Sequence, residues 1–595
     1  MAIETLSDLF YGSVDGFRKP EHLRYKQGGA WRAWSSDELR AAVEETSMGL
    51  ASLGLDRGDH VAILSENRPE WAFADMAVLA LGGADVPIYP SLPAAQVRYI
   101  LADSEAKAVF VSNATQAAKV AEARGGLEGL KHVIAFEPVE GALALEELRA
   151  RGREALAKEK DAVRTRAARV KASDLATIIY TSGTTGDPKG VMLTHGNLVS
   201  NTLGAAKFLP QLQPDWTCLS FLPLCHVFER TAGHNLMLYA GATIAYAESV
   251  ERVADNMVEV RPQIMSSVPR LYEKMYARVH EKVAKDPKWR QAVFRWALAV
   301  GRAGFQARVA RRSPGPLLRL KLALAERLVF AKIKERTGGR LEIFVSGGAP
   351  LSREIAEFFG AADILICEGY GLTETSPVIT CNRPERLRPG SVGQPIEGVE
   401  VKIAEDGEIL TRGPHVMRGY YKKPEATREA IDPEGFFHTG DIGTLDADGY
   451  LSITDRKKDL LVTSGGKKIA PQPIENVLKR SPLVAEAVVL GDRRKYAAAL
   501  IVPEFGALER RLKDLGRPPG ERAELVRRDD VVALYREIVD ALNRELSQFE
   551  RIKQFRLLPR EFTIESGELT PTVKVRRRAV EQNWAAEIEE MYRES

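Results

Sequence analysis

The sequence predicts an α/β protein with a large N-terminal domain of helix-covered, mostly parallel sheets and a small, mobile α+β C-terminal domain. At 595 residues the chain exceeds the size at which a single hydrophobic core stops growing. Apolar strand-like runs alternate with helical stretches over residues 35–400, which is typical of parallel sheets covered by helices. From residue 399 the pattern changes to short strands separated by turns, which indicates a different, largely antiparallel unit.

The elements of the large domain follow from this alternation. A helix is expected over residues 36–53, and the charged segment 151–171 is interpreted as a surface helix or linker. Strands are expected at residues 60–65, 107–111, 131–136, 175–180, 341–346 and 364–367.

The rest of the chain divides into two smaller units. Turn signals at Asp406-Gly407, residues 432–435 and Asp448-Gly449 predict a small, largely antiparallel barrel over about residues 399–454. A hairpin near residues 450–469, a helix opening at Pro471, strands at 484–490 and 497–502, and further helices are expected after it. We place the domain boundary at Asp455, which gives domains of residues 1–454 and 455–595.

Composition excludes several classes of protein. Hydrophobic residues make up 45% and charged residues 28%, as in ordinary soluble globular proteins. The net charge of +3 gives no general case for nucleic-acid binding. Cys218, Cys225, Cys367 and Cys381 form no C-x-x-C pair and have no histidine at zinc-site spacing, so we expect buried free thiols in a reducing cytosol.

No membrane-spanning or secretory segment is expected. The N-terminus lacks a basic stretch followed by an apolar one, and no run of about 18 apolar residues occurs, so a cytoplasmic location is predicted. Residues 302–340 combine many Arg and Lys residues and interleaved leucines with only Glu326 and Glu335, which predicts a basic amphipathic helical segment. Two interpretations stay open: a solvated helix face docked on the main domain, which is favoured, and a peripheral contact with a membrane surface.

The most specific motif is Tyr-Thr-Ser-Gly-Thr-Thr-Gly-Asp-Pro-Lys-Gly at residues 180–190. A strand runs into a loop whose backbone N–H groups and hydroxyls can point into one concavity, while its glycines let a phosphate approach the main chain. Lys189 follows Pro188 and precedes Gly190, so neither the spacing nor the Ser/Thr of a Walker P-loop is present. The loop is therefore predicted to hold polyphosphate without being a P-loop.

This motif resembles the phosphate loop of the adenylate-forming superfamily, which includes acyl-CoA synthetases, luciferases and peptide-synthetase adenylation domains. Further motifs follow in the family's order: residues 346–350 (Ser-Gly-Gly-Ala-Pro), 368–374 (Glu-Gly-Tyr-Gly-Leu-Thr-Glu), 438–441 (His-Thr-Gly-Asp) and 455–459 (Asp-Arg-Lys-Lys-Asp), and Lys574 near the C-terminus. The resemblance covers most of the chain and implies that Asp455 is the hinge of a turning C-terminal domain.

The resemblance also implies a role for each residue of an ATP site. The β- and γ-phosphates would lie against Thr181, Ser182, Gly183, Thr184, Thr185, Gly186 and Lys189. Thr373 would contact the α-phosphate and Glu374 would bind Mg²⁺, although a glutamate at a helix start also stabilises the helix dipole. Tyr370 would stack on adenine, with Gly348, Ala349, Pro350, Glu368, Gly369 and Gly371 around it. The ribose hydroxyls would bind Asp441, with Arg456 reaching the same sugar.

The same resemblance implies the groups for both half-reactions. Lys574 would bridge the acyl carboxylate and the α-phosphate, although Val573 replaces the glycine that usually precedes this lysine and a solvated basic turn is the rival interpretation. The loop that lines the pantetheine channel of CoA in the family corresponds here to Ser464, Gly465, Gly466 and Lys467.

Residues 222–230 (Leu-Pro-Leu-Cys-His-Val-Phe-Glu-Arg) are similar to the long-chain acyl-CoA synthetase version of an acyl-site motif. His226 would border the reacting carboxylate, and the acyl tunnel would be lined by Val227, Phe228, Val268, Pro269 and Gly347. Burial of a methylene is worth about 0.8 kcal/mol, so a dry tunnel alone can set chain length.

The function predicted is ATP-dependent and Mg²⁺-dependent ligation of a long-chain fatty acid to CoA through an acyl-adenylate. A fatty acyl-AMP ligase and an aryl- or medium-chain acyl-CoA ligase remain alternatives with the same first half-reaction. A non-catalytic nucleotide- or lipid-binding scaffold is the alternative from a different class. The joint presence of Lys189, Glu374, Asp441, Arg456 and Lys574 argues against that scaffold.

Overall fold

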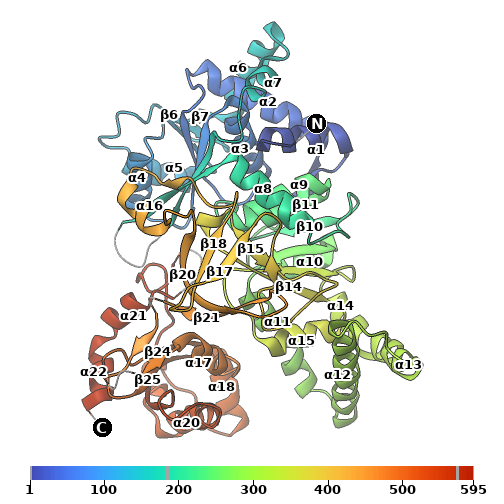
Figure 1. The fold of residues 1–595 in the computed structure, drawn as a ribbon, viewed down its shortest axis with the longest axis vertical. Coiled ribbons are helices and arrows are strands. Elements are labelled where there is room, and N and C mark those ends of the chain that lie inside the picture. Colours follow the sequence, from blue (N-terminus) through green and yellow to red (C-terminus); the bar gives the residue numbers. More distant parts are fainter. Residues whose placement is uncertain (1–2, 182–186, 458, 465–466, 571–574, 594–595) are drawn as a thin grey trace.

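The computed structural model describes residues 3–181, 187–457, 459–464, 467–570 and 575–593. It confirms the predicted α/β class: a large body built on two sheets and a half-barrel, followed by a separate small C-terminal unit (Figure 1).

The first large sheet has eight strands in the order β19-β9-β8-β4-β3-β5-β6-β7. Its bounds are β3 (His60–Leu64), β4 (Ala84–Ile88), β5 (Ala108–Val111), β6 (His132–Ala135), β7 (Leu143–Ala144), β8 (Leu175–Thr181), β9 (Lys189–Thr194) and β19 (Gly419–Tyr420). The strands from β8 to β7 are parallel, whereas β9 is antiparallel to both of its neighbours. The associated helices are α2 (Ser36–Ser52), α3 (Pro69–Leu81), α4 (Ala94–Asp103), α5 (Ala114–Ala123), α6 (Leu145–Lys158), α7 (Ala162–Ala167) and α8 (His195–Ala206).

The second large sheet has nine strands in the order β16-β15-β14-β13-β12-β10-β11-β1-β2. Its bounds are β1 (Leu23–Gln27), β2 (Ala30–Trp34), β10 (Thr217–Ser220), β11 (Thr243–Tyr246), β12 (Ile264–Ser267), β13 (Ile343–Ser346), β14 (Leu365–Gly371), β15 (Val378–Cys381) and β16 (Gln394–Pro395). Its helices are α1 (Leu6–Phe17), η1 (Glu229–Asn235), α9 (Leu236–Ala240), α10 (Val253–Val260), α11 (Pro269–Ala284), α12 (Lys288–Val309), α13 (Pro316–Ala325), η2 (Glu326–Phe330), α14 (Ala331–Glu335), α15 (Arg353–Ala361) and η3 (Thr373–Thr375). The central strands are parallel and the strands at both edges are antiparallel.

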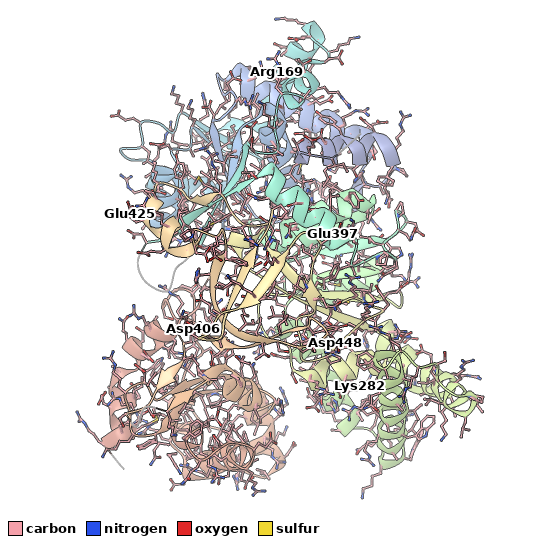
Figure 2. The ribbon with its side chains drawn as sticks, in the orientation of Figure 1. Arg169, Lys282, Glu397, Asp406, Glu425 and Asp448 are labelled. Carbon is pink, nitrogen blue, oxygen red and sulfur yellow. The ribbon has the colours of Figure 1, made fainter. Side chains whose placement is uncertain are left out.

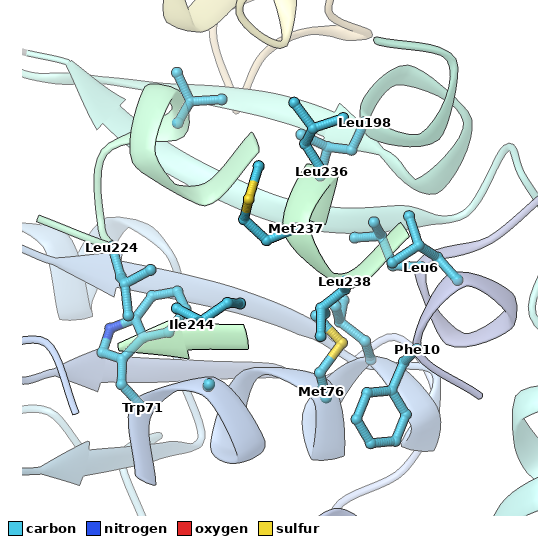
Figure 3. Packing of buried hydrophobic residues seen from close by; sticks show 14 of the residues in the cluster. Leu6, Phe10, Trp71, Met76, Leu198, Leu224, Leu236, Met237, Leu238 and Ile244 are labelled. Atoms are coloured by element: carbon cyan, nitrogen blue, oxygen red, sulfur yellow. The ribbon is translucent and has the colours of Figure 1, made fainter. Parts of the chain in front are cut away.

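One hydrophobic core joins the two sheets. Figure 3 shows Trp71 and Met76 of α3 packed with Leu238 of α9 and Ile244 of β11, and Phe10 of α1 closing the same layer. These side chains are almost completely buried. Because helices α1, α3 and α9 lie between the sheets, the two sheets form a single body that fixes the loops at their edges.

The predicted barrel is an open half-barrel. β17 (Glu400–Ile403), β18 (Glu408–Arg412), β20 (Phe437–Leu445) and β21 (Leu451–Arg456) form an antiparallel sheet in that order, with α16 (Pro424–Ala430) beside it. Within the described residues, the edge strands β17 and β21 do not pair with each other, so the sheet does not close.

The hairpin expected over residues 450–469 is partly wrong. β21 pairs with β20, because Leu451 is fully buried beside Ile409 in the core of the half-barrel. The hairpin itself is shorter and joins β22 (Leu461–Val462) to β23 (Lys468–Ile469).

The C-terminal unit is the expected α+β structure with its own core. It contains α17 (Pro471–Leu478), β24 (Val484–Leu490), β25 (Ala497–Pro503), α18 (Phe505–Asp514), α19 (Arg522–Leu525), α20 (Asp529–Asn543), β26 (Ile552–Leu557), α21 (Arg577–Asn583) and α22 (Ala585–Arg593). β26 was not foreseen, and it pairs in parallel with β25. The domain boundary at Asp455 stays a prediction, since β21 runs through it.

The structure also bears on the expectations about membrane-spanning helices and about the cysteines. Across the described part of the chain, no helix combines the length and the apolar character that crossing a bilayer would need. The four cysteines are free and buried, as expected.

Candidate active site

The phosphate motif connects two paired strands. β8 ends at Thr181 and β9 begins at Lys189, and these two residues are direct partners in the antiparallel ladder. Ser182, Gly183, Thr184, Thr185 and Gly186 lie outside the described residues. The Lys189 Nζ lies 4.9 Å from the centre of the Tyr420 ring, close enough for a cation–π contact.

Glu374 lies on the other side of Tyr420. The Tyr420 hydroxyl donates a hydrogen bond of 3.0 Å to Glu374 Oε1, and the Met417 N–H donates to the Glu374 carbonyl at 2.8 Å. Removal from water raises the pKa of the Glu374 carboxyl, and this effect is opposed by the Tyr420 hydrogen bond and by the charges of Arg456 and Lys189. One aromatic ring therefore links the predicted phosphate lysine to the predicted metal carboxylate.

The donor set around Glu374 suits a magnesium ion that arrives with phosphate. Mg²⁺ usually binds one or two carboxylates and completes its shell with phosphate oxygens and water. Within the described residues no group of three or more His, Cys, Asp or Glu side chains is placed to hold a metal. A partly desolvated single carboxylate fits an ion whose remaining ligands come from the substrate, and Thr373 adjoins it in η3.

Three predicted nucleoside residues form one hydrogen-bonded cluster. The Tyr370 hydroxyl donates to Asp441 Oδ2 at 2.6 Å, and the Arg456 Nε lies 3.2 Å from Asp441 Oδ1. Asp441 and Arg456 are direct cross-strand partners on β20 and β21, while Tyr370 comes from β14. The carboxylate is thus held in place by an aromatic hydroxyl and a guanidinium from two different sheets.

The residues on either side of Tyr370 in β14 are two closely packed glycines and, one residue further, the buried Glu368. A Cβ on Gly371 would lie 1.7 Å from the Pro377 carbonyl oxygen, so this position excludes any side chain unless the backbone moves. At Gly369 the nearest atom, the Thr380 carbonyl oxygen, would lie 3.4 Å from a Cβ. Burial raises the pKa of Glu368 to about 7, and its Oε1 accepts a hydrogen bond from the Leu351 N–H at 3.3 Å.

Several predicted acyl residues meet at the end of β13. A Cβ on Gly347 would lie 3.1 Å from the Phe228 ring, so the ring packs against the bare backbone. Gly348 has a φ of +83°, a conformation that favours glycine, and the nearest side chain to its Cβ position is Val268. Ala349 and Pro350 are exposed beyond it.

The other three predicted acyl residues differ in how deeply they are buried. Pro269 is the buried first residue of α11. His226 is partly exposed, and its Nδ1 accepts a hydrogen bond from the Phe228 N–H at 3.1 Å. Val227 is fully buried in the main core, and its acyl-site role stays a prediction.

Asp455 lies where the half-barrel meets the C-terminal unit. Its Oδ1 accepts a hydrogen bond from the Arg456 N–H at 2.6 Å, and burial raises its pKa to about 6. Two residues later the Lys457 Nζ contacts Asp406 at 2.6 Å and Glu408 at 2.8 Å. Figure 2 labels Asp406 above the C-terminal unit. The chain just after Asp455 is therefore tied to the half-barrel, and the hinge role stays a prediction.

The described ends of the predicted thiol-channel loop, Ser464 and Lys467, adjoin the strands β22 and β23. The Ser464 N–H donates to the Arg494 carbonyl at 2.9 Å, and the Lys467 N–H donates to Thr463 Oγ1 at 3.1 Å. Both Ser464 and Lys467 are exposed. Gly465, Gly466 and Lys574 lie outside the described residues, so their roles rest on the sequence.

Sequence reasoning missed two features of this region. One is Tyr420, because nothing local in its sequence indicates a contact with Glu374. The other is a fully buried triad in which the Arg230 guanidinium contacts Asp75 at 2.6 Å and Asp85 at 2.9 Å. Burial raises the pKa of both carboxyls and Arg230 opposes this, so the triad ties η1 to α3 and β4.

Comparison with known proteins shows the family. Residues 14–421 match the model of the AMP-binding enzymes, and residues 458–595 match that of the AMP-binding enzyme C-terminal domain. The chain therefore belongs to the AMP-binding enzyme family.

Individual relatives and solved structures resemble the chain over nearly its whole length. The chain is 38% identical over 586 residues to the long-chain-fatty-acid–CoA ligase FadD15 of Mycobacterium bovis, covering 96% of this chain and 95% of that protein. It is 33% identical to the peroxisomal long chain acyl-CoA synthetase 6 of Arabidopsis thaliana, covering 100% of this chain and 87% of that protein. The anthranilate CoA ligase AuaEII, solved with anthranoyl-AMP, shares the fold with a TM-score of 0.72 at 21% identity, covering 98% of each chain.

Proposed function

We propose that this chain is an AMP-forming long-chain fatty acid:CoA ligase that uses ATP and CoA as co-substrates and Mg²⁺ as cofactor. The observation that carries the proposal is a pair of clusters, Lys189–Tyr420–Glu374 and Tyr370–Asp441–Arg456. They lie near each other, since burial raises the pKa of the Glu374 carboxyl and the charge of Arg456 opposes this rise. The first offers a cation and a carboxylate suited to magnesium polyphosphate, and the second offers an aromatic face and a carboxylate suited to a nucleoside. The proposed location is the cytoplasm.

In the first half-reaction a carboxylate oxygen of the acid attacks the α-phosphorus of ATP. A new P–O bond forms, the bond to the β-phosphate oxygen breaks, and pyrophosphate leaves. Two anions approach each other, so cations placed where charge develops lower the barrier. Lys189 and the 181–186 loop would bind the departing phosphates, Thr373 the α-phosphate, and Lys574 the two reacting anions. Mg²⁺, held by Glu374, would supply further positive charge.

In the second half-reaction the thiol sulfur of CoA attacks the acyl carbon of the adenylate. The C–S bond forms, the C–O bond to AMP breaks, and the thiol proton is released. Ser464, Gly465, Gly466 and Lys467 would line the path of the pantetheine arm. Because Lys574 and this loop belong to one small unit, a turn about Asp455 would present them in succession.

Long-chain preference is supported by the acyl region and by the names of the relatives. Phe228 packs against Gly347 beside Val268, which provides an apolar boundary next to His226. The FadD15 relative and the Arabidopsis relative are both described as acting on long chains.

Assay of a series of straight-chain acids, from hexanoate to stearate, with ATP and CoA tests the proposal. Each added methylene is worth about 0.8 kcal/mol, so kcat/KM for thioester formation should rise about fourfold per methylene until the tunnel is filled. Benzoate and anthranilate serve as controls and should be poor substrates. Preference for an aromatic or short acid would contradict long-chain specificity, and acyl-AMP accumulation without thioester would indicate an acyl-AMP ligase.

A further inference from the structure

The helix α13 presents a stripe of exposed leucines. Leu317, Leu320, Leu324 and Leu328 are spaced by three, four and four residues, which places them on one side of the helical segment formed by α13 and η2. They are exposed by 66%, 69%, 48% and 44%, respectively. We call these four residues the leucine stripe.

The opposite side of the same segment is packed. Ala325 and Phe330 are buried in a core shared with α12 and α15, and Leu318 and Leu322 pack against that core. α12 and α13 approach closely, since a Cβ on Gly304 would lie 2.8 Å from Leu322. The leucine stripe is therefore a second apolar face on a helix that is already docked, and folding of the described chain leaves it facing solvent.

Positive charge surrounds the leucine stripe. Residues 302–340 contain eleven Arg or Lys residues and two Glu residues, whereas the whole chain has a net charge of only +3, so the rest of the protein is net acidic. Arg308 pairs with Asp363 and Lys334 pairs with Glu326. Among the described residues, no acidic group forms a salt bridge with Arg319, Lys321 or Arg327. Lys321 and Arg327 flank the stripe, whereas Arg319 is exposed roughly 100° around the helix from Leu320.

A cavity behind α13 adds to this chemistry. It measures about 560 Å³ and lies between α12, α13 and α15. Its apolar lining includes Phe305 and Phe330, and its charged lining consists of Arg308, Arg311, Arg312, Glu326 and Asp363. The three arginines outnumber the two acidic side chains, so the cavity adds positive charge next to α13.

We propose that the leucine stripe and its flanking cations form a peripheral docking surface for a membrane that contains anionic lipid. A bilayer offers acidic head groups directly above an apolar layer, which matches cations beside exposed leucines. A nucleic-acid backbone would pair with the cations but would leave the leucines in water. In Figure 1, α12 and α13 project from the body at the lower right, and α13 forms the outer end of the projection.

The docking surface follows the proposed acyl residues along the chain. α11 begins at Pro269, next to Val268, and leads directly into α12. Long-chain acids partition into bilayers, so docking would bring the protein to the membrane that holds its proposed substrate. The proposal goes beyond ligase activity and does not depend on it, since binding is measured without ATP, CoA or acid.

A fluorescent label locates the surface that meets the lipid. The four native cysteines are buried, so a cysteine introduced by Leu320→Cys can be labelled selectively with an environment-sensitive dye such as NBD. Its emission should shift to the blue and rise severalfold with phosphatidylcholine vesicles that contain phosphatidylglycerol. The matched control Val250→Cys, at a valine with 65% exposure in a different part of the body, should show no change.

Vesicle flotation of the full-length chain then tests the charges and the leucines separately. Each Lys or Arg near an anionic surface contributes about fivefold, so Arg319→Gln, Lys321→Gln and Arg327→Gln together should weaken binding on the order of 10²-fold. Leu317→Gln with Leu320→Gln should abolish the part of the binding that persists at high salt. A control in which Lys158, Lys160 and Arg169 become Gln removes three exposed cations from the opposite end of the molecule (Figure 2) and should bind normally.

Three outcomes would overturn the proposal. One is binding of wild-type protein to neutral and anionic vesicles alike, and another is equal loss of binding in the control variant. The third is a blue shift of the Leu320→Cys label that occurs without lipid and grows with protein concentration, because this would assign the stripe to self-association. Far-UV circular dichroism spectra and thermal unfolding midpoints that match wild type show that the variants are folded.

Discussion

Glu374→Gln should slow acid-dependent adenylation by about 10²- to 10³-fold while leaving the protein folded. The substitution removes the negative charge but keeps an oxygen that can accept the hydrogen bond of 3.0 Å from the Tyr420 hydroxyl. If Glu374 holds Mg²⁺ against the phosphates, the ion is bound less tightly and charge on the transferring group is less well stabilised. Acid-dependent exchange of pyrophosphate into ATP, measured over a range of Mg²⁺ concentrations, should show both the lower rate and a higher Mg²⁺ requirement.

Two control variants distinguish the effect of the Glu374 charge from the effects of its hydrogen bond and of surface carboxylates in general. Tyr420→Phe removes the hydrogen bond and keeps the carboxylate, so its loss should be much smaller, about tenfold or less. Glu425→Gln removes an exposed carboxylate of α16 (Figure 2), whose ion pair among the described residues is a surface pair with Arg428, and it should behave as wild type. A Glu374→Gln rate within threefold of wild type at every Mg²⁺ concentration would remove Glu374 from the proposed metal site.

Arg230→Met should destabilise the N-terminal body by about 3–5 kcal/mol. Arg230, Asp75 and Asp85 are all completely buried, and the guanidinium is bound to both carboxylates. Methionine fills part of the volume but leaves two acidic groups in an apolar region without their cation, which is costly. Chemical denaturation should show the N-terminal transition moved to a lower midpoint, while the C-terminal unit, which has its own core, keeps its transition.

A neutral version of the triad supplies the decisive comparison. Adding Asp75→Asn and Asp85→Asn to Arg230→Met removes the unpaired charges and should restore most of the lost stability. Arg252→Met, at a half-exposed arginine paired with Asp255, should cost less than about 1 kcal/mol. A cost below 1 kcal/mol for Arg230→Met, or no recovery in the neutral triple variant, would contradict this account of the triad.

Local patterns were enough to predict much of the fold. The alternation of apolar runs and helices gave β3, β5, β6, β13 and α2 to within one or two residues, because parallel strands between covering helices are apolar throughout. The pairing of the strands could not be predicted from these local patterns. The sequence around Leu451 predicts a strand whether β21 belongs to the half-barrel or to the next unit. The structure decides between them, because Leu451 is buried beside Ile409 and β21 pairs with β20.

The residues of the candidate site that belong to sequence motifs could be predicted. Contacts between residues far apart in the sequence could not. The resemblance brought Tyr370, Asp441 and Arg456 together, and the structure places them in hydrogen-bond or ion-pair contact, although their binding roles stay predictions. Tyr420 reaches Glu374 across 46 positions and Arg230 reaches Asp75 across 155, and no periodicity encodes such pairs. The leucine stripe was visible only as part of a basic amphipathic segment, because sequence alone did not reveal which leucines pack.

Transfer of labelled oxygen tests the central claim most directly. Palmitate labelled with ¹⁸O in its carboxylate should be incubated with ATP, Mg²⁺ and CoA, and the nucleotide product analysed by mass spectrometry. If the carboxylate oxygen attacks the α-phosphorus and the adenylate is then cleaved at its acyl carbon, one ¹⁸O atom appears in AMP and the other in palmitoyl-CoA. Formation of ADP with the label in inorganic phosphate, or of unlabelled AMP, would contradict an acyl-adenylate mechanism.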